Sequence, residues 1–218
     1  MPTDQTDPIR DDYNRMAEAY ARQLFNELDG KPLDRELLLR FRSAVGDGEV
    51  CDMGCGPGHV ARFLRDAGAR VLGLDLSPEM LVHARRLSPD IEFREGNLLA
   101  LEIPDNSLAG ITAFYAIVNI PADTLPRVFR EMTRVLKPGG LLLLAFHVGG
   151  EVLRPEELWG QKVSMEFYHF NRALIEILLT EAGFRIEEVV ERGPYAPEVE
   201  YQSRRAYIFA RKPETWAE

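Results

Sequence analysis

Apolar residues along this chain form two kinds of pattern, short continuous runs and longer stretches with helical spacing. Five apolar runs of strand length follow residue 48, and stretches whose apolar residues recur every three or four positions lie between them. This alternation is typical of a parallel sheet covered by helices on both faces. The predicted strands are 49–53, 70–75, 91–95, 108–114 and 141–146, and the predicted helices lie near 57–68, 77–87 and 122–136.

Cap and turn residues mark the ends of these helices. Pro57 stands at a first helical position, and Ser77-Pro78 predicts an N-cap followed by proline. The sequence KPGG at 137–140 ends the third helix. Further elements are expected outside this region: helices at 9–28, 32–45 and 171–183, strands at 184–190 and 206–211, an irregular stretch at 147–170 and a short disordered lead at 1–8.

The two helices before the sheet are amphipathic and are separated by the sequence DGKP at 29–32. They are expected to form either a packed cap or half of a dimer interface, so a monomer and a homodimer both remain open.

The charge balance limits the partners of the chain. Its 218 residues include 26 Lys and Arg against 35 Asp and Glu, which gives a formal charge of -9. Neutralising nucleic-acid phosphates needs clustered basic residues, and the basic residues here are scattered, so no nucleic-acid partner is expected. No apolar run reaches membrane-spanning length, so no membrane partner is expected either.

The two cysteines, Cys51 and Cys55, are four positions apart, with no third or fourth ligand of matching spacing nearby. Packed thiols are therefore favoured over a metal site. So few cysteines suit a reducing cytoplasm.

A glycine-rich turn joins the first strand to the helix that follows it. Gly54, Gly56 and Gly58 are spaced as G-x-G-x-G, and Asp52 stands two residues before the first glycine. Such a turn lets the backbone approach a bound nucleoside more closely than side chains would permit. The dinucleotide fingerprint needs its third glycine, or an alanine, one position later, where this chain has His59.

An acidic residue, Asp75, ends the second predicted strand. Its two carboxylate oxygens can accept hydrogen bonds from the paired hydroxyls of a ribose. The alternative is an acid that caps the next helix, but Ser77 is the better cap. Pro57 lacks an N–H where a pyrophosphate would use the first free amides of a helix, which argues against a dinucleotide.

These motifs resemble the class I S-adenosylmethionine-dependent methyltransferases of the small-molecule type, whose first motif reads apolar-x-Asp/Glu-x-Gly-x-Gly-x-Gly. Gly96-Asn97 looks like the family's Gly-Asp-hydrophobic motif, and the sequence at 135–140 resembles its helix-to-strand junction. The resemblance implies a Rossmann-like α/β sheet of seven strands in the order 3-2-1-4-5-7-6, with strand 7 antiparallel. It also implies a single domain, 1–218, made of an N-terminal helical cap at 9–46, a cofactor-binding core at 48–146, and acceptor-side loops, a helix and a terminal hairpin at 147–218.

The cofactor implied by the resemblance is S-adenosylmethionine, with S-adenosylhomocysteine as the product. The segment from Tyr13 to Tyr20 resembles a family motif whose tyrosines close over the methionine end, although two core aromatics on one helix face are the commoner arrangement. Asn97 either meets the adenine or only forms a turn, and Tyr115 either bonds the cofactor or packs. The implied cofactor-binding residues are Tyr13, Tyr20, Asp52, Gly54, Cys55, Gly56, Gly58, Asp75, Leu76, Met80, Asn97, Leu98 and Tyr115.

The acceptor side is expected in the loops 147–170 and 193–203, whose aromatic residues suit a flat or apolar small molecule. Many relatives carry His where this chain has Asn119, and an amide cannot accept a proton near neutral pH. His147, at a strand end, is the first candidate base and His169 the second, although histidines beside aromatic residues more often only pack. Carboxylates at the pocket mouth would favour an amine, whereas incidental surface acids are the simpler interpretation.

The expected reaction is in-line transfer of a methyl group to an oxygen, nitrogen, sulfur or carbon nucleophile of a small molecule. Two alternatives stay open at this point. One is a Rossmann-type NAD-dependent oxidoreductase, and the other is a non-catalytic protein that binds S-adenosylmethionine.

Overall fold

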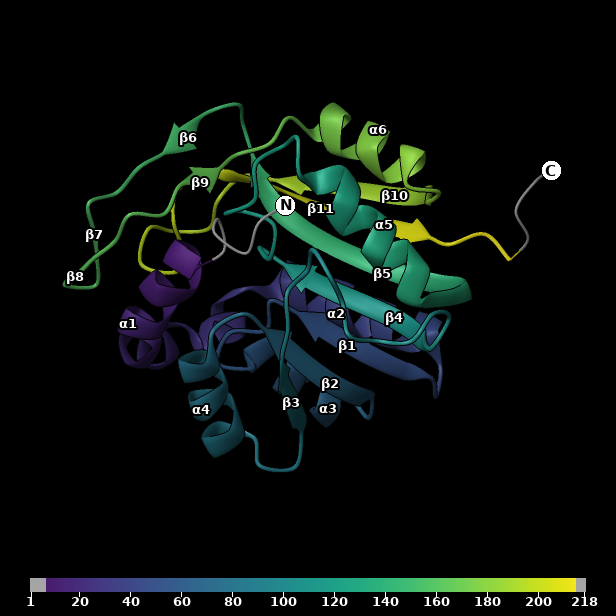
Figure 1. Ribbon diagram of the computed structural model, residues 1–218, viewed down its shortest axis with the longest axis horizontal. Helices are drawn as coiled ribbons and strands as arrows, with labels where there is room; N and C mark the ends of the chain where they lie inside the picture. Colours follow the sequence, from purple (N-terminus) through teal and green to yellow (C-terminus); the bar gives the residue numbers. More distant parts are fainter. Residues whose placement is uncertain (1–6, 215–218) are drawn as a thin grey trace.

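The structure is a computed structural model that describes residues 7–214, and its centre is a seven-stranded sheet (Figure 1). The strand order is β10-β11-β5-β4-β1-β2-β3, in which β11 runs antiparallel to both of its neighbours. The predicted order 3-2-1-4-5-7-6 with an antiparallel last strand is therefore confirmed. The strands are β1 (Glu49–Met53), β2 (Arg70–Asp75), β3 (Glu92–Glu95), β4 (Leu108–Phe114), β5 (Leu136–Val148), β10 (Arg185–Arg192) and β11 (Arg204–Arg211).

Helices cover both faces of this sheet, as Figure 1 shows. Successive side chains of a strand point to opposite faces, so the apolar run of β5 contributes to two separate cores. Leu142 and Leu144 pack in the core under α5 and α6, whereas Leu141 and Leu143 pack in the core under α2 and α3. The helices are α1 (Asp7–Leu24), the short 3-10 helix η1 (Glu27–Gly30), α2 (Pro32–Val45), α3 (His59–Asp66), α4 (Pro78–Leu87), α5 (Leu125–Val135) and α6 (Arg172–Glu181).

Several element boundaries differ from those expected from the sequence. The first helix ends at Leu24 rather than near 28, and η1 takes up the following turn. Strand β5 begins at Leu136 rather than at 141, because Leu136 already pairs with Leu108 before the register shifts. Of the expected lead at 1–8, residues 1–6 lie outside the described part of the chain, and helix α1 already begins at Asp7.

The stretch 147–170 is not irregular, and the part from 149 to 170, called the arm below, forms two small antiparallel ladders. Trp159 and Gly160 have positive φ values of 48° and 78°, which suits a two-residue hairpin turn. These strands are too short for their alternation to be recognised in the sequence. They are β6 (Val152–Leu153), β7 (Glu157–Leu158), β8 (Gln161–Lys162) and β9 (Phe167–Tyr168).

Buried charged groups fix the loop between β10 and β11 to helix α2. The carboxylate of Asp34, which is 1% exposed, accepts hydrogen bonds from the Tyr207 hydroxyl at 2.9 Å and from Arg192 at 3.0 Å. Arg192 also pairs with Glu200 of the loop, and the Tyr195 hydroxyl accepts from the backbone N–H of Leu33 at 3.1 Å. This loop is thus held by specific polar contacts.

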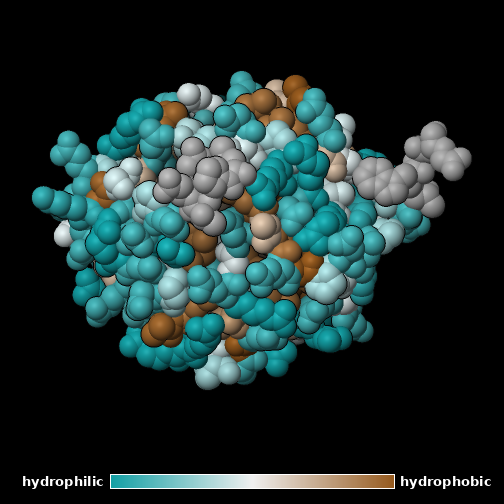
Figure 2. Space-filling view, in the orientation of Figure 1, coloured by the Kyte–Doolittle hydropathy of each residue, from teal (hydrophilic) through white to brown (hydrophobic). Residues whose placement is uncertain are grey.

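The surface carries small hydrophobic areas between polar residues, and the face in Figure 2 is mostly hydrophilic. Within residues 7–214, no helix is both long enough and apolar enough to cross a membrane.

The absence of a side chain at Gly110 of β4 sets how closely α2 packs on the sheet. A Cβ at this position would lie 2.7 Å from Phe41 Cζ and 2.7 Å from Val45 Cγ1. We expect Gly110→Ala to lower the free energy of unfolding by about 1–3 kcal/mol, because α2 would have to shift. Chemical denaturation measures this, with Gly150→Ala as the control, because a Cβ there meets nothing within 4 Å. Equal stability of the two variants would contradict the prediction.

Candidate functional site

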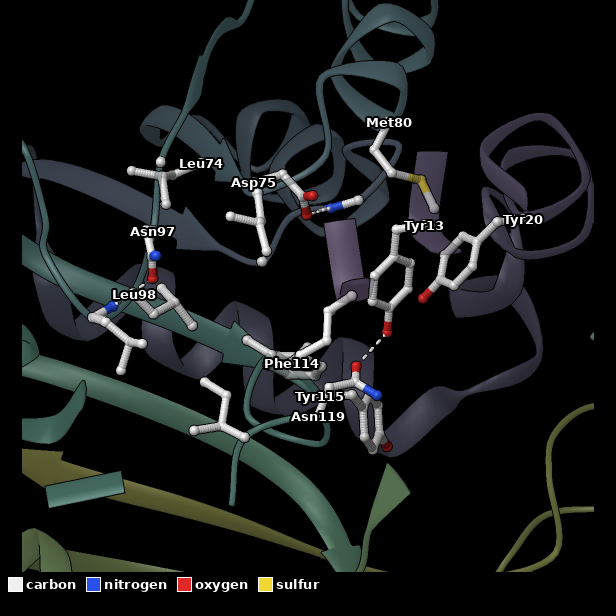
Figure 3. Close-up of a pocket in the computed structure, with 18 residues that line it drawn as sticks. Tyr13, Tyr20, Leu74, Asp75, Met80, Asn97, Leu98, Phe114, Tyr115 and Asn119 are labelled. Carbon is white, nitrogen blue, oxygen red and sulfur yellow. Dashed lines mark hydrogen bonds between the residues drawn. The ribbon is translucent and has the colours of Figure 1, made fainter. Parts of the chain in front are cut away.

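A cavity lies beyond the carboxyl ends of β1, β2 and β4, beneath helix α1 (Figure 3). Ligands of open parallel sheets bind at this edge. Most of its wall is apolar or aromatic, and its polar groups come from α1, β2 and the segments that follow β3 and β4. It is lined by Ile9, Tyr13, Tyr20, Gly54, Gly56, Leu74, Asp75, Leu76, Met80, Gly96, Asn97, Leu98, Leu99, Phe114, Tyr115, Ala116, Asn119 and Ile120.

The glycine turn after β1 brings backbone to the cavity wall. Gly54 and Gly56 have φ values of +67° and +52°, a region that favours glycine. A Cβ on Gly54 would lie 2.7 Å from Ala116 Cβ, so the turn and the segment after β4 are in close contact. A Cβ on Gly56 would meet only Tyr20, at 3.7 Å, so the missing side chain leaves open space at the cavity.

The Asp75 carboxylate lies at the end of β2 and is held by backbone amides. Its Oδ2 accepts from Gly56 N–H at 2.7 Å, and its Oδ1 accepts from Ser77 N–H at 2.9 Å (Figure 3 draws the first). Burial raises the pKa of Asp75, which these backbone hydrogen bonds counteract. The cap of α4 is the Ser77 hydroxyl, which accepts from Met80 N–H at 3.1 Å. Each Asp75 oxygen therefore keeps a free lone pair for a ligand hydroxyl.

Asn97 and Leu98 line the cavity in the turn after β3. The Asn97 side-chain oxygen accepts from Leu99 N–H at 2.9 Å, which is the contact of a tight turn. The turn-forming alternative for Asn97 is therefore present in the structure, and a contact with adenine stays a prediction.

Both tyrosines of α1 line the cavity, seven residues apart on one helix face (Figure 3). Their rings meet edge to face with centroids 6.2 Å apart. Helix α1 is fixed over α4 by Asn14, whose side-chain oxygen accepts from the Ser77 hydroxyl at 2.7 Å. The pair thus faces the cavity rather than one of the sheet's two cores.

The arm closes on the same helix. The Asp12 carboxylate, 0% exposed, accepts from Ser164 N–H at 2.7 Å and from Met165 N–H at 2.8 Å. Trp159 meets Tyr20 edge to face at 5.3 Å. Helix α1 and the arm consequently pack together as one cover beside the cavity.

Three residues expected to bind the cofactor lie outside the cavity wall. Asp52 is 2% exposed and accepts from the Thr112 hydroxyl at 2.9 Å and from Ala61 N–H at 3.1 Å. Burial raises the pKa of Asp52 to about 6. Cys55 packs in an apolar cluster, and Gly58 is the N-cap of α3 with φ +84°. These residues shape the turn from behind, and their direct contact with a cofactor stays a prediction.

The two candidate bases also lie outside the wall. His147 Nδ1 is 2.7 Å from the Ser203 hydroxyl, and its ring stacks on Tyr115 at 4.8 Å, so Tyr115 stands against both His147 and the cavity. Burial, together with the nearby Arg205 charge, lowers the pKa of His147 to about 3. His169 is 7% exposed, and its Nδ1 lies 2.8 Å from a Glu151 carboxylate oxygen.

Glu200 of the loop 193–203 is committed to the protein itself. It is 8% exposed and pairs with Arg192 and with Arg205, the latter at 3.0 Å. An amine at the pocket mouth therefore gains nothing from this carboxylate. No three His, Cys, Asp or Glu side chains converge as metal ligands within residues 7–214.

Sequence reasoning did not assign several wall residues. They are apolar residues that lie near the ends of β2 and β4, in the segments after β3 and β4, or on α1. Their place beside a strand end is the only sequence signal for most of them. These residues are Ile9, Leu74, Leu99, Phe114, Ala116 and Ile120.

Comparisons with known proteins identify methyltransferases among the relatives of this chain. The family described as "Methyltransferase domain" matches residues 50–140. A malonyl-[acyl-carrier protein] O-methyltransferase of Pectobacterium atrosepticum is 33% identical over 148 residues, which are 67% of this chain and 56% of that one. A demethylmenaquinone methyltransferase of Renibacterium salmoninarum is 36% identical over 111 residues, 51% of this chain and 46% of that one. The chain spans about half the length of these relatives.

Solved structures share the fold. A methyltransferase of Methanosarcina mazei superposes with a TM-score of 0.70 at 21% identity, covering 77% of this chain and 93% of that one. A second, of Mesorhizobium loti, gives a TM-score of 0.62 at 24% identity and covers 79% and 95%.

The residues present suit S-adenosylmethionine. The open backbone at Gly56 and the free lone pairs of Asp75 suit a ribose, and the aromatic rings of Tyr13 and Tyr20 suit a positively charged sulfur. The matching family and the relatives described above are methyltransferases, so the NAD-dependent alternative is set aside. By its strand order, its glycine turn and its relatives, the chain belongs to the class I S-adenosylmethionine-dependent methyltransferases.

Proposed function

We propose that this chain transfers the methyl group of S-adenosylmethionine to a nucleophilic atom of a small acceptor molecule. The observation that supports this most directly is the cavity itself. Asp75 and Gly56 line one part of its wall, and Tyr13 and Tyr20 project into it from α1. When bound, the cofactor supplies a methyl group on a positive sulfur, so the transfer mainly requires positioning in line with the nucleophile and exclusion of water.

The chain's own residues provide that positioning. The Asp75 carboxylate is held by two backbone amides before any ligand arrives, so its orientation costs nothing on binding. The Asn14–Ser77 contact and the Asp12 contacts hold α1 over the cavity, which keeps water away from it.

The acceptor that fits best is one that needs no base. Among the described residues that line the cavity, the titratable groups are Asp75 and three tyrosines, and burial raises the pKa of each tyrosine. A phenol that keeps its proton cannot take one from an acceptor. An ionised carboxylate already carries its nucleophilic lone pair, and its methylation to an ester releases no proton.

The relatives support this acceptor class. Several are named O-methyltransferases of malonyl-[acyl-carrier protein], and a malonyl thioester has one free carboxyl group. We therefore propose a carboxylic acid as the acceptor, reached past Asn119 and the arm. The free thiols Cys51 and Cys55 support a reducing, cytoplasmic location, and a monomer or homodimer is the proposed assembly.

A non-catalytic protein that binds S-adenosylmethionine remains the second candidate, because neither candidate histidine lines the cavity. The two are separated by incubation with methyl-labelled S-adenosylmethionine, a panel of carboxylic acids and acyl thioesters, and a metabolite extract. We expect labelled products that release methanol in base, as methyl esters do, detected by mass spectrometry. Tight cofactor binding without any labelled product would favour the second candidate, and a base-stable product would exclude a carboxylate.

Asp75 is expected to carry much of the cofactor affinity. Asp75→Ala should weaken S-adenosylhomocysteine binding at least tenfold in calorimetry, since hydrogen bonds to a charged group contribute about 1.5–3 kcal/mol each. Asp75→Asn, which keeps one acceptor oxygen, should lose less. Asp47→Ala is the control, because that carboxylate is fully exposed and outside the cavity. Unchanged affinity in a folded Asp75→Ala protein would remove the ribose assignment.

His147 should affect the pH dependence of stability. Its pKa is about 3 in the folded chain and about 6.5 when unfolded, so as pH falls below 6.5 only the unfolded chain takes up the proton. The free energy of unfolding should therefore decline by about 2 kcal/mol from pH 7 to pH 5 through this residue alone.

Chemical denaturation of a His147→Gln variant at both pH values measures this contribution. The variant should lose correspondingly less stability than the unmodified protein over that interval. His83→Gln, at a histidine of α4 that does not contact His147, should lose as much stability between the two pH values as the unmodified protein does. If His147→Gln followed the unmodified protein at both pH values, the burial argument would be wrong.

A further inference from the structure

One hydrogen bond crosses the cavity wall between α1 and the segment after β4. The Tyr13 hydroxyl donates to the side-chain oxygen of Asn119 at 2.7 Å, which Figure 3 shows as a dashed line. Asn119 is 8% exposed, and its Nδ2 donates to the backbone carbonyl of Glu166 in the arm at 2.7 Å. A carbonyl can only accept, so the Asn119 amide has one orientation, with its nitrogen toward Glu166 and its oxygen toward Tyr13.

This orientation fixes what the Tyr13 oxygen can do. A phenol has one proton, and here it is donated in a hydrogen bond to the Asn119 oxygen. Burial and the negative charges of Asp75 and Asp12 raise the pKa of Tyr13, so the proton stays on the phenol. Among residues 7–214 no group donates to the Tyr13 oxygen. Its remaining lone pairs can therefore only accept, and they are available to a ligand in the cavity.

The position of this oxygen indicates which part of a ligand it meets. In Figure 3, Asn97 and Leu98 lie on one side of Asp75, and Tyr13, Tyr20 and Asn119 lie on the other. If Asp75 holds the ribose and Asn97 borders the base, the methylated sulfur lies toward Tyr13. This step rests on the proposed function.

That Tyr13 lies at the methionine end of the cofactor is what the family resemblance implies. We propose that Asn119 is the positioning residue for Tyr13: by accepting the hydrogen bond of the phenol, it turns the lone pairs of the Tyr13 oxygen toward the positively charged, methyl-bearing centre of the cofactor. Glu166 completes the chain by fixing the Asn119 amide. The same contacts tie α1, the segment after β4 and the arm together. The alternative is that the Tyr13–Asn119 hydrogen bond only holds α1 in place.

Two ligands that differ at this centre separate the alternatives. S-adenosylhomocysteine has a neutral sulfur there, whereas sinefungin has a carbon that bears an amino group, which is protonated at neutral pH and donates hydrogen bonds. The measured quantity is the ratio of the two dissociation constants from calorimetry at pH 7. A purely structural role for Tyr13 and Asn119 would change both constants together and leave the ratio as it was.

We expect Tyr13→Phe to reduce the preference for sinefungin about tenfold or more, because a hydrogen bond to a charged group is lost. Asn119→Ala should also reduce it, since the Tyr13 proton is then free to turn toward the ligand. Tyr201→Phe, an exposed tyrosine outside the cavity wall, should match the unmodified protein.

The outcomes are distinct. An unchanged ratio in Tyr13→Phe overturns the proposed recognition, and an unchanged ratio in Asn119→Ala overturns the role of Asn119. If the unmodified protein bound neither ligand, the proposed function itself would fail.

Discussion

The site depends on two backbone hydrogen bonds that end on a single carbonyl. Gly54 and Cys55 both donate to the Leu74 carbonyl, at 2.7 and 3.0 Å, and so fasten the turn after β1 to the end of β2. Only with that turn in place can the Gly56 amide reach the Asp75 carboxylate at 2.7 Å. A backbone with positive φ at Gly54 and Gly56 is what lets the chain make these contacts, because a Cβ would be strained at both positions. The wall that is proposed to bind the nucleoside is therefore formed by the chain's own hydrogen bonds.

A second layer of contacts, from α1 and the arm, covers this wall. Asp12 is buried and accepts hydrogen bonds from two consecutive backbone amides of the arm. Moving the arm away from α1 would break these hydrogen bonds and leave the carboxylate and both N–H groups without their partners. The neighbouring residue, Tyr13, bonds Asn119 after β4. Adjacent positions of one helix thus hold two different segments, and an acceptor that approaches past Asn119 must pass this junction.

The sheet and much of the cavity wall could be predicted because their signals are local. Apolar runs, the G-x-G-x-G turn and Asp75 at a strand end each specify geometry within a few residues. Asp52 shows the limit of that approach. Its place in the motif predicts cofactor binding, which stays a prediction, but the motif does not indicate that its oxygens accept from Thr112 and from Ala61 N–H. Only the pairing of β1 with β4 brings Thr112 beside it. Contacts that depend on strand order cannot be found from spacing alone.

The arm and the ion pairs behind it were hidden for the same reason. Glu200 belongs to the loop 193–203, whose acids are interpreted from the sequence as incidental surface acids, yet it is buried against Arg192 and Arg205. The strands of the arm have two residues each, which is too short for alternation to be visible. His147 lies near a strand end as expected, but burial and the nearby Arg205 charge lower its pKa to about 3. The residues that surround it, such as Tyr115 and Arg205, come from other elements.

The resulting electrostatics favour chemistry that moves no proton. A histidine with so low a pKa is neutral at pH 7 but a weak base, and the phenols at the cavity hold their protons. The cofactor's sulfonium already provides the driving force for transfer, so a base would help only an acceptor that arrives protonated. Such a site needs no base when the acceptor is already an anion. A residue at the position of the base can then serve to orient other groups. Under the proposal, Asn119 has this orienting role, because its amide accepts one hydrogen bond from Tyr13 and donates one to Glu166. An imidazole with two tautomers would fix these directions less strictly.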